Sequence, residues 1–193
     1  MTDLVLASGS PRRSEMLKQM GLEFSVHVSD IDETRKEKEL PEDYVVRLAR
    51  EKALAVKKIT PDFGEQTAIL AADTIVVQGD RVYGKPRDYE HAQRIWRALS
   101  ATKHQVITAV SLLVGDSVQV KVSVTDVDFV VINEEQMQRY WATGEPSDKA
   151  GAYAIQGFAS AWVKQIQGSY SNVVGLPLRE VNQLLTSVQL NWL

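Results

Sequence analysis

The segment Leu4-Val5-Leu6-Ala7-Ser8-Gly9-Ser10-Pro11-Arg12-Arg13 predicts how the fold begins. Its first four residues are an apolar run typical of a buried strand, and the small polar residues that follow end that strand. Ser10 is a favourable N-cap and Pro11 suits the first position of a helix, so we expect a helix to begin there. The segment therefore predicts a strand, a short loop and a helix in close succession.

The rest of the chain continues to alternate between helical and strand patterns. We expect further helices from Pro41, Asp88, Asn133 and Pro177, and strands over 24–28, 68–77, 82–83, 105–132 (two strands around Gly115-Asp116) and 158–166. Because both crossovers and hairpins occur, the pattern predicts an α/β fold with a mixed β-sheet flanked by helices. No repeat or low-complexity linker interrupts it, so residues 1–193 are expected to form a single domain with room for two small lobes.

Composition excludes several classes of protein. The 25 acidic and 22 basic residues give a net charge of −3, which argues against a broadly basic nucleic-acid surface. The absence of cysteine excludes disulfides, thiolate metal sites and a cysteine nucleophile. No apolar stretch is long enough for a membrane helix and the N-terminus lacks a basic signal region, so we expect a cytoplasmic protein with neither nucleic-acid nor membrane partners.

The start of the first helix is a candidate anion site. Free backbone amides at a helix N-terminus favour a phosphate, and Ser8, Arg12 and Arg13 would add polar and cationic groups there. Two solvated arginines on a surface helix remain the alternative for this segment taken alone. The pattern is neither a Walker A loop nor a dinucleotide fingerprint.

Asp73 interrupts an otherwise apolar strand, where a carboxylate is costly unless it is paired, bound to a metal or open to a cleft. We favour a cleft, and a structural aspartate held by an arginine or by backbone amides is the alternative. Asp30, Asp32 and Glu33 supply further oxygen ligands that suit Mg²⁺ or Mn²⁺, although such a loop can also be merely solvated.

Two lysines stand out by their positions. Lys52 interrupts the apolar face of the helix that begins at Pro41, and Lys85 lies between Gly84 and Pro86. Both are candidate phosphate ligands, while a lysine that extends along the helix to reach water is the alternative for Lys52. The chain thus offers cations for phosphates, carboxylates for a metal, and one carboxylate on a strand that can activate water. Together these groups predict a site that hydrolyses a polyphosphate.

Six sequence blocks, in order along the whole chain, resemble the Maf family of nucleotide pyrophosphatases. They are Leu6-Ala7-Ser8-Gly9-Ser10-Pro11-Arg12-Arg13, Arg47-Leu48-Ala49-Arg50-Glu51-Lys52-Ala53, Ala72-Asp73-Thr74-Ile75-Val76, Gly84-Lys85-Pro86-Arg87-Asp88, Asp148-Lys149-Ala150-Gly151-Ala152-Tyr153-Ala154-Ile155-Gln156-Gly157 and Asn172-Val173-Val174-Gly175-Leu176-Pro177. The set is far more specific than any one of its motifs.

The resemblance implies hydrolysis of a nucleoside triphosphate between its α and β phosphates, with a divalent cation such as Mg²⁺, Mn²⁺ or Co²⁺. It also implies an elongated twisted sheet, two lobes with a cleft between them, similarity to inosine triphosphate pyrophosphatases, and a homodimer.

The resemblance assigns roles to single residues as well. Asp73 matches the family's proton acceptor, and Lys52 and Lys85 match residues that take part in catalysis. The matched phosphate ligands are Ser8, Arg12 and Arg13, and the matched metal ligands are Glu33 and Asp73. Arg12, Thr74 and Gln156 match the positions that distinguish the branch acting on dTTP and UTP, which implies a role in clearing unwanted or modified pyrimidine nucleotides. Two other functions stay open: a nucleotide-binding regulator of septum formation, and a pyrophosphatase for another base, such as 7-methyl-GTP.

Overall fold

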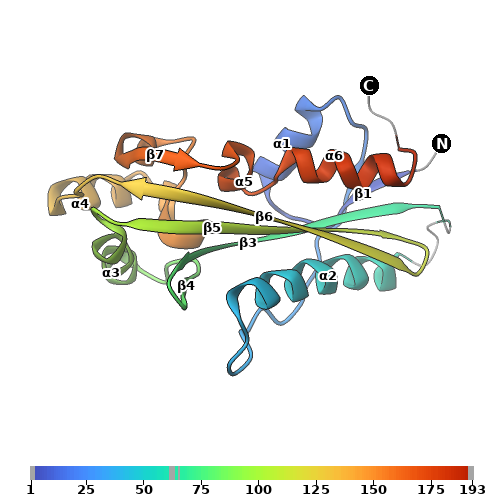
Figure 1. The fold of residues 1–193 in the computed structure, drawn as a ribbon, viewed down its shortest axis with the longest axis horizontal. Helices are drawn as coiled ribbons and strands as arrows, with labels where there is room; N and C mark the ends of the chain where they lie inside the picture. The colour runs from blue at the N-terminus through green and yellow to red at the C-terminus, as the bar shows by residue number, and fades with distance from the viewer. Residues whose placement is uncertain (1–2, 61–63, 65, 191–193) are drawn as a thin grey trace. The chain divides into compact units, whose positions relative to one another are not determined.

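The computed structural model describes residues 3–60, 64 and 66–190, and its elements are those of an α/β protein (Figure 1). In chain order they are β1 (Leu4–Leu6), α1 (Pro11–Gln19), β2 (Ser25–Val26), α2 (Pro41–Ile59), β3 (Ala68–Gln78), β4 (Arg81–Tyr83), α3 (Tyr89–Leu99), β5 (Lys103–Val114), β6 (Ser117–Phe129), α4 (Glu134–Ala142), the 3₁₀ segments η1 (Glu145–Asp148), η2 (Ala150–Ala152) and η3 (Phe158–Trp162), β7 (Val163–Gln167), α5 (Tyr170–Val174) and α6 (Leu178–Ser187).

The strands of the described residues form a seven-stranded sheet in the order β2-β1-β3-β5-β6-β7, with β4 paired to β3. β1 runs parallel to β2 and β3, whereas β4 is antiparallel to β3 and β7 is antiparallel to β6. The sheet is therefore mixed, and the α/β fold expected from the sequence is confirmed.

The chain divides into two compact units, as the expectation of two lobes anticipates. Unit 1 comprises Met1–Asp73, Thr108–Ser123 and Gly175–Leu193, and unit 2 comprises Thr74–Ile107 and Val124–Val174. The three long strands β3, β5 and β6 contribute residues to both units.

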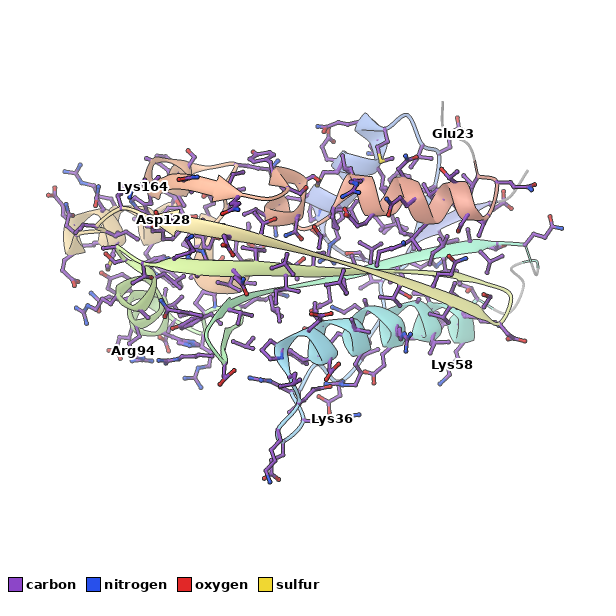
Figure 2. All side chains as sticks on the ribbon, viewed as in Figure 1. Glu23, Lys36, Lys58, Arg94, Asp128 and Lys164 are labelled. Atoms are coloured by element: carbon purple, nitrogen blue, oxygen red, sulfur yellow. The ribbon has the colours of Figure 1, made fainter. Side chains whose placement is uncertain are left out.

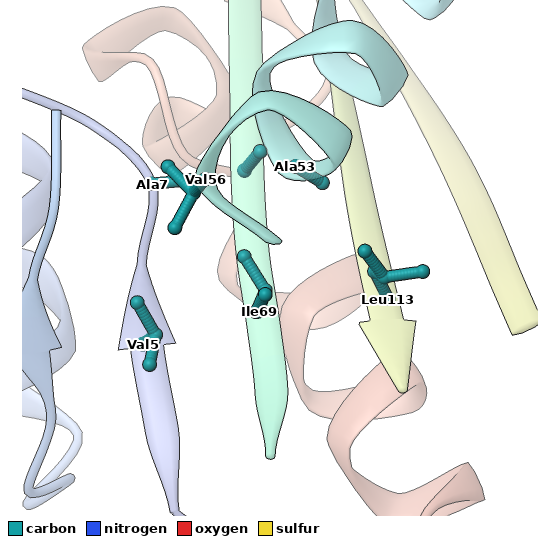
Figure 3. Packing of buried hydrophobic residues seen from close by; sticks show 7 residues of the cluster. Val5, Ala7, Ala53, Val56, Ile69 and Leu113 are labelled. Carbon is teal, nitrogen blue, oxygen red and sulfur yellow. The ribbon is translucent and has the colours of Figure 1, made fainter. Parts of the chain in front are cut away.

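Unit 1 has a core in which α2 packs against the strands. Figure 3 shows this cluster, whose buried members are Val5, Ala7, Ala53, Val56, Ile69, Ala71 and Leu113. Pro41 occupies the first turn of α2, Glu42 and Asp43 lie near its N-terminus, and Lys57 and Lys58 lie in its last turn. This distribution of charge complements the helix dipole and stabilises the helix by about 0.3–1 kcal/mol per residue. None of the described helices combines the length and the apolar character needed to cross a membrane.

The register of β1 against β3 positions the first candidate residues. Leu4 pairs with Ala68 and Leu6 pairs with Leu70 in the parallel ladder. The N–H of Ala7 then donates to the carbonyl oxygen of Leu70 at 2.7 Å. The loop after β1 therefore leaves the sheet at the carboxyl ends of β1 and its other parallel neighbour, β2, while β3 continues to Gln78. Ligands in open α/β sheets bind at the carboxyl ends of parallel strands.

Unit 2 is built around aromatic side chains. The ring of Trp96 on α3 lies 5.5 Å from the ring of Tyr140 and 5.8 Å from the ring of Trp162, measured between centroids. The indole N–H of Trp96 also donates to the carbonyl oxygen of Ala152 at 2.8 Å. Aromatic pairs in such tilted and edge-on arrangements contribute about 0.5–1.5 kcal/mol each beyond the area that they bury.

The predicted strand over 158–166 is wrong in its first half. Residues Phe158–Trp162 form the 3₁₀ segment η3, and the strand β7 covers only Val163–Gln167. Ala159 and Trp162 are buried three residues apart, which matches one turn of a 3₁₀ helix and not the alternation of a strand. The aromatic core around Trp162 therefore decides the local structure.

Two smaller differences concern short elements. The predicted strand over 24–28 is reduced to Ser25–Val26. Val28 is exposed, so a longer strand would gain little stability from the burial of its side chain. The short helix Tyr170–Val174 was not predicted from the sequence. Its Asn172 is fully buried and donates from Nδ2 to the carbonyl oxygen of Val106 and to Oγ1 of Thr125.

Candidate active site

Arg13 ties together three segments of unit 1. Its Nη1 donates to the carbonyl oxygen of Ala72 at 2.6 Å and to Oγ of Ser8 at 3.2 Å, and its Nε donates to the carbonyl oxygen of Gly175 at 2.8 Å. Burial lowers the pKa of this guanidinium, whereas the charge of Asp73 raises it. Arg13 thus fixes the loop after β1 against β3.

Ser8 and Arg12 complete the segment that was predicted to bind an anion. Ser8 is buried, and its Oγ accepts a hydrogen bond from the N–H of Ser10 at 3.2 Å. Arg12 lies in the first turn of α1 and is half-buried. The structure brings these residues beside Arg13, and their binding of phosphate stays a prediction.

Lys52 lies between two carboxylates. Its Nζ is 2.6 Å from Oδ1 of Asp73 and 2.7 Å from Oε1 of Glu33. The side chains of Lys52 and Asp73 are only 12% and 11% exposed, while that of Glu33 is half exposed. The lysine on the apolar face of α2 is therefore part of a charge cluster, and the alternative of a lysine that merely reaches water is wrong.

The environment of Asp73 sets its protonation. Burial raises the pKa of Asp73, and the charges of Lys52 and Arg13 oppose that rise. A carboxylate whose pKa is raised holds a proton more strongly than an ordinary surface aspartate, which suits a proton acceptor. The sequence left open an aspartate held by an arginine or by backbone amides. The structure places Nζ of Lys52 2.6 Å from Oδ1 of Asp73, and the charge of Arg13 acts on the same carboxylate.

Only one carboxylate of the acidic loop faces this cluster. Oδ1 of Asp32 accepts a hydrogen bond from the N–H of Thr34 at 2.9 Å, which lowers the pKa of Asp32, and Asp30 is exposed. Glu33 alone pairs with Lys52 among the three acidic residues of the loop. Asp32 therefore belongs to a local turn of the loop, and Glu33 belongs to the charge cluster.

Two residues of α2 that sequence reasoning missed hold this loop in place. The hydroxyl of Tyr44 donates to the carbonyl oxygen of Glu33 at 2.7 Å, and Nη2 of Arg47 donates to the carbonyl oxygen of Thr34 at 3.0 Å. Arg47 also pairs with Glu39 at 2.7 Å and lowers the pKa of Glu39 to about 2. A polar residue on each successive turn of α2 was the available signal, because such residues share one face of a helix.

The donor set of unit 1 fits a divalent cation in part. Within residues 3–60, 64 and 66–190, no group of three or more His, Asp and Glu side chains is placed to hold a metal. Glu33 and Asp73 nevertheless converge on one positive charge, the ammonium of Lys52. Mg²⁺ is often bound by one or two carboxylates together with substrate phosphates and water, so two converging carboxylates suit it.

The other three predicted residues belong to unit 2. Thr74 follows Asp73 along β3 and is half-buried, and Lys85 is exposed on the loop after β4. Gln156 is exposed near the end of the segment between η2 and η3. Contacts of neighbouring residues hold the positions of Lys85 and Gln156.

Gly151 anchors the loop of Lys85. Its N–H donates to the carbonyl oxygen of Gly84 at 3.1 Å, and its backbone has a φ of +69°. A Cβ at this position would lie 2.7 Å from Cγ2 of Val76, so only glycine fits against β3. Gly151 therefore packs closely against Val76 of β3 and, through its hydrogen bond to Gly84, holds the loop of Lys85 near that strand.

The turn that carries Gln156 is fixed from both sides. The hydroxyl of Tyr140 donates to Oε1 of Glu145 at 2.6 Å and accepts from the N–H of Ala154 at 3.0 Å. A Cβ on Gly157 would lie 2.0 Å from Oε2 of Glu145, so the carboxylate of Glu145 would have to move to admit a larger residue. Gln156 thus lies on a turn that these hydrogen bonds hold in place, which suits a residue that selects a ligand.

Residues 3–188 match the family model described as "Maf-like protein". The chain is 49% identical over 187 residues to the dTTP/UTP pyrophosphatase of Pseudoalteromonas atlantica, with 97% of each chain covered. It is 49% identical over 187 residues to the dTTP/UTP pyrophosphatase of Escherichia coli O157:H7, covering 97% of this chain and 93% of that relative. It is 45% identical to the protein of the same name from Vibrio cholerae, covering 96% and 97%.

A solved structure, that of the Staphylococcus aureus Ham1 protein, is similar with a TM-score of 0.49 and 11% sequence identity. The match covers 97% of this chain and 98% of that chain.

Proposed function

The chain belongs to the Maf family, and from this premise we propose that it hydrolyses dTTP and UTP to the nucleoside monophosphate and pyrophosphate. The contact that carries the proposal is the ion pair of Lys52 with Asp73, since it holds a buried carboxylate ready to accept a proton. The names of the relatives at 45–49% identity support the choice of substrates.

Asp73 is the proton acceptor in this proposal. Water adds to the α phosphorus and loses a proton to the carboxylate of Asp73, while the bond from the α phosphorus to the bridging oxygen breaks and pyrophosphate leaves. Lys52 keeps Asp73 ionised and oriented through its contact at 2.6 Å. The burial of Asp73 supports this role, because it raises the proton affinity of the carboxylate.

Cationic and polar groups bind the phosphates. Ser8, Arg12 and Arg13 lie around the start of α1, where the helix dipole favours an anion. Lys85 supplies a further positive charge from the loop after β4. In this assignment Arg13 also has a structural role, because it donates hydrogen bonds to two backbone carbonyl oxygens and to the hydroxyl of Ser8.

The reaction is proposed to need a divalent cation, Mg²⁺, Mn²⁺ or Co²⁺, which Glu33 and Asp73 would hold. When bound, it would neutralise charge on the phosphate oxygens during the displacement. The convergence of both carboxylates on the ammonium of Lys52 supports this pair as ligands.

Arg12, Thr74 and Gln156 are proposed to select the pyrimidine base. The exposed amide of Gln156 offers both a donor and an acceptor, which is the pattern that uracil and thymine require at their carbonyl and N3 hydrogen. The hydrogen bonds of the turn around Gln156 support this role: the N–H of Gly157 donates to the carbonyl oxygen of Ala154, and the N–H of Ala154 donates to the hydroxyl of Tyr140.

A proposal on the biological setting accompanies this activity. We propose that residues 1–193 act as one cytoplasmic nucleotide pyrophosphatase domain, working as a homodimer without nucleic-acid or membrane partners, and that it removes modified as well as canonical pyrimidine nucleotides. The net charge of −3 is consistent with a small anionic substrate that is bound locally.

A panel of nucleoside triphosphates tests the proposal. Pyrophosphate release should be measured for dTTP, UTP, CTP, GTP, 7-methyl-GTP and modified pyrimidine nucleotides, each with Mg²⁺, Mn²⁺ and Co²⁺ and with EDTA. We expect dTTP and UTP to have the highest kcat/KM and EDTA to abolish turnover. A preference for 7-methyl-GTP would contradict the base assignment, and binding of dTTP without turnover would favour a nucleotide-binding regulator.

A further inference from the structure

Unit 2 contains a pocket of about 440 Å³ lined by β4, the loop that follows it and α3. Four of the lining residues carry full positive charges and a fifth is a histidine: Arg81, Lys85, Arg87, Arg94 and His91. No Asp or Glu lines the pocket. In a chain with a net charge of −3, such a local excess of positive charge requires an explanation.

The positive charges of the pocket are poorly neutralised by the protein. Among the described residues, no carboxylate lies within ion-pair distance of Arg81, Lys85 or Arg87. Arg94, which lies on α3 (Figure 2), approaches Glu90 only at 3.9 Å, and both side chains are more than half exposed. An exposed pair at this distance contributes little, so the four cations remain available to an external anion.

Arg81 is held in position by a chain of contacts. Its guanidinium lies 5.2 Å from the centroid of the buried Tyr83 ring. The hydroxyl of Tyr83 donates to Oε1 of Gln78 at 3.1 Å, and Nε2 of Gln78 donates to Oγ1 of Thr102 at 2.8 Å. A cation that is oriented before a ligand arrives loses less entropy on binding.

His91 presents a donor to the same pocket. Its Nδ1 accepts a hydrogen bond from the backbone N–H of Arg87 at 3.2 Å, so the neutral ring carries its proton on Nε2. Burial, followed by the charges of Arg87 and Arg94, lowers the pKa of His91. The ring therefore adds a neutral hydrogen-bond donor beside the four cations.

We propose that this pocket is a subsite for a condensed phosphate anion, taken either as the terminal two phosphates of a nucleoside triphosphate or as free inorganic pyrophosphate. Arginine forks match phosphate oxygens in pairs, and a pocket of this volume has room for more than one phosphate group. A nucleobase fits less well, because the aromatic ring that lines the pocket is buried and is covered by Arg81. The inference rests on the proposed function, in which Lys85 already contacts phosphate.

Isothermal titration calorimetry with inorganic pyrophosphate, in metal-free buffer of constant ionic strength, tests the subsite. We expect the double variant Arg81→Gln/Arg94→Gln to bind pyrophosphate about tenfold or more weakly than the unmodified protein. Arg97→Gln is the matched control, because it removes the same charge from α3 at a residue that pairs with Glu134 and does not line the pocket. Equal affinity in the double variant, or an equal loss in the control, would overturn the proposal.

NMR of the three histidine rings locates the anion in the unmodified protein and needs no variant. Addition of pyrophosphate should shift the ring signals of His91 and leave those of the buried His104 and of His27 in place. Binding without a shift at His91 would place the anion elsewhere and contradict the subsite.

Kinetics with dTTP separates the two sources of the anion. A raised KM with unchanged kcat in the double variant shows that the substrate's own terminal phosphates occupy the pocket. An unchanged KM with weakened pyrophosphate binding shows that the pocket takes free pyrophosphate. Both results support the subsite. Failure of the unmodified protein to hydrolyse dTTP would contradict the proposed function alone, since calorimetry and NMR still decide the subsite.

Discussion

The ammonium of Lys52 lies 2.6 Å from Oδ1 of Asp73, and the same ammonium lies 2.7 Å from Oε1 of Glu33. This arrangement links α2, β3 and the acidic loop through one positive charge. Burial raises the pKa of Asp73, and Lys52 is the largest of the influences that oppose it. The proton affinity of Asp73 is therefore the property on which the proposed chemistry depends most.

Asp73→Asn should lower kcat for dTTP about 10²-fold or more while the protein stays folded. The change removes the proton acceptor but keeps the size of the side chain and much of its hydrogen bonding. Steady-state kinetics gives kcat, and circular dichroism checks the fold. A folded variant with nearly full activity would remove Asp73 from the mechanism.

Lys52→Met should move the acidic limb of the pH profile of kcat to higher pH by about one unit or more. Removing the positive charge of Lys52 leaves only the charge of Arg13, among the cations named above, to oppose burial, so the pKa of Asp73 rises further and the carboxylate becomes protonated at a higher pH. Activity is lost as the pH falls through that pKa, because only the ionised form accepts a proton.

Lys52→Arg is the control for this pH profile. It retains the positive charge, so its acidic limb should stay close to that of the unmodified protein even if kcat falls. If the limb of Lys52→Met coincides with that of the unmodified protein, Lys52 does not tune Asp73.

The elements of this fold with a strong local signal could be predicted from the sequence. The sequence predicts helices from Asp88 and from Asn133. Asp88 caps α3 by accepting from the N–H of His91, and Asn133 forms a capping box with Gln136 at the start of α4. The segment Phe158–Trp162 was mispredicted because tertiary burial of Trp162, and not local propensity, sets its conformation.

The candidate site was predictable in its residue types but not in its pairings. An unexplained lysine on an apolar helical face and an aspartate inside an apolar strand each stood out, yet only the packing of α2 on β3 brings Lys52 to Asp73. The contacts of Tyr44 and Arg47 with the acidic loop were missed, because the polar residues on successive turns of α2 do not show in the sequence which backbone carbonyls they bind.

Gln156→Glu should lower kcat/KM for dTTP and UTP by an amount equivalent to about 1–3 kcal/mol. The ionised carboxylate lacks a donor for the base carbonyl and places an unpaired charge beside it. GTP should be affected less, because guanine offers hydrogens on N1 and N2. Equal losses for dTTP, UTP, CTP and GTP would show that Gln156 only supports its loop.

Gly151→Ala should reduce the free energy of unfolding by about 3 kcal/mol or more. The added Cβ meets both a φ of +69° and the side chain of Val76 at 2.7 Å. Gly79→Ala is the matched control, since Gly79 has a φ of +59° with nothing within 4 Å of its Cβ position. This substitution should lower the free energy of unfolding by only about 1 kcal/mol. Urea unfolding measures both, and equal losses would mean that the contact with Val76 is unimportant.

The products formed from dTTP test the central claim most directly. ³¹P NMR of a reaction with the unmodified protein and Mg²⁺, Mn²⁺ or Co²⁺ should show dTMP and pyrophosphate in equal amounts, because the proposed attack is at the α phosphorus. The appearance of dTDP and orthophosphate would mean cleavage at the terminal phosphate and would contradict the account.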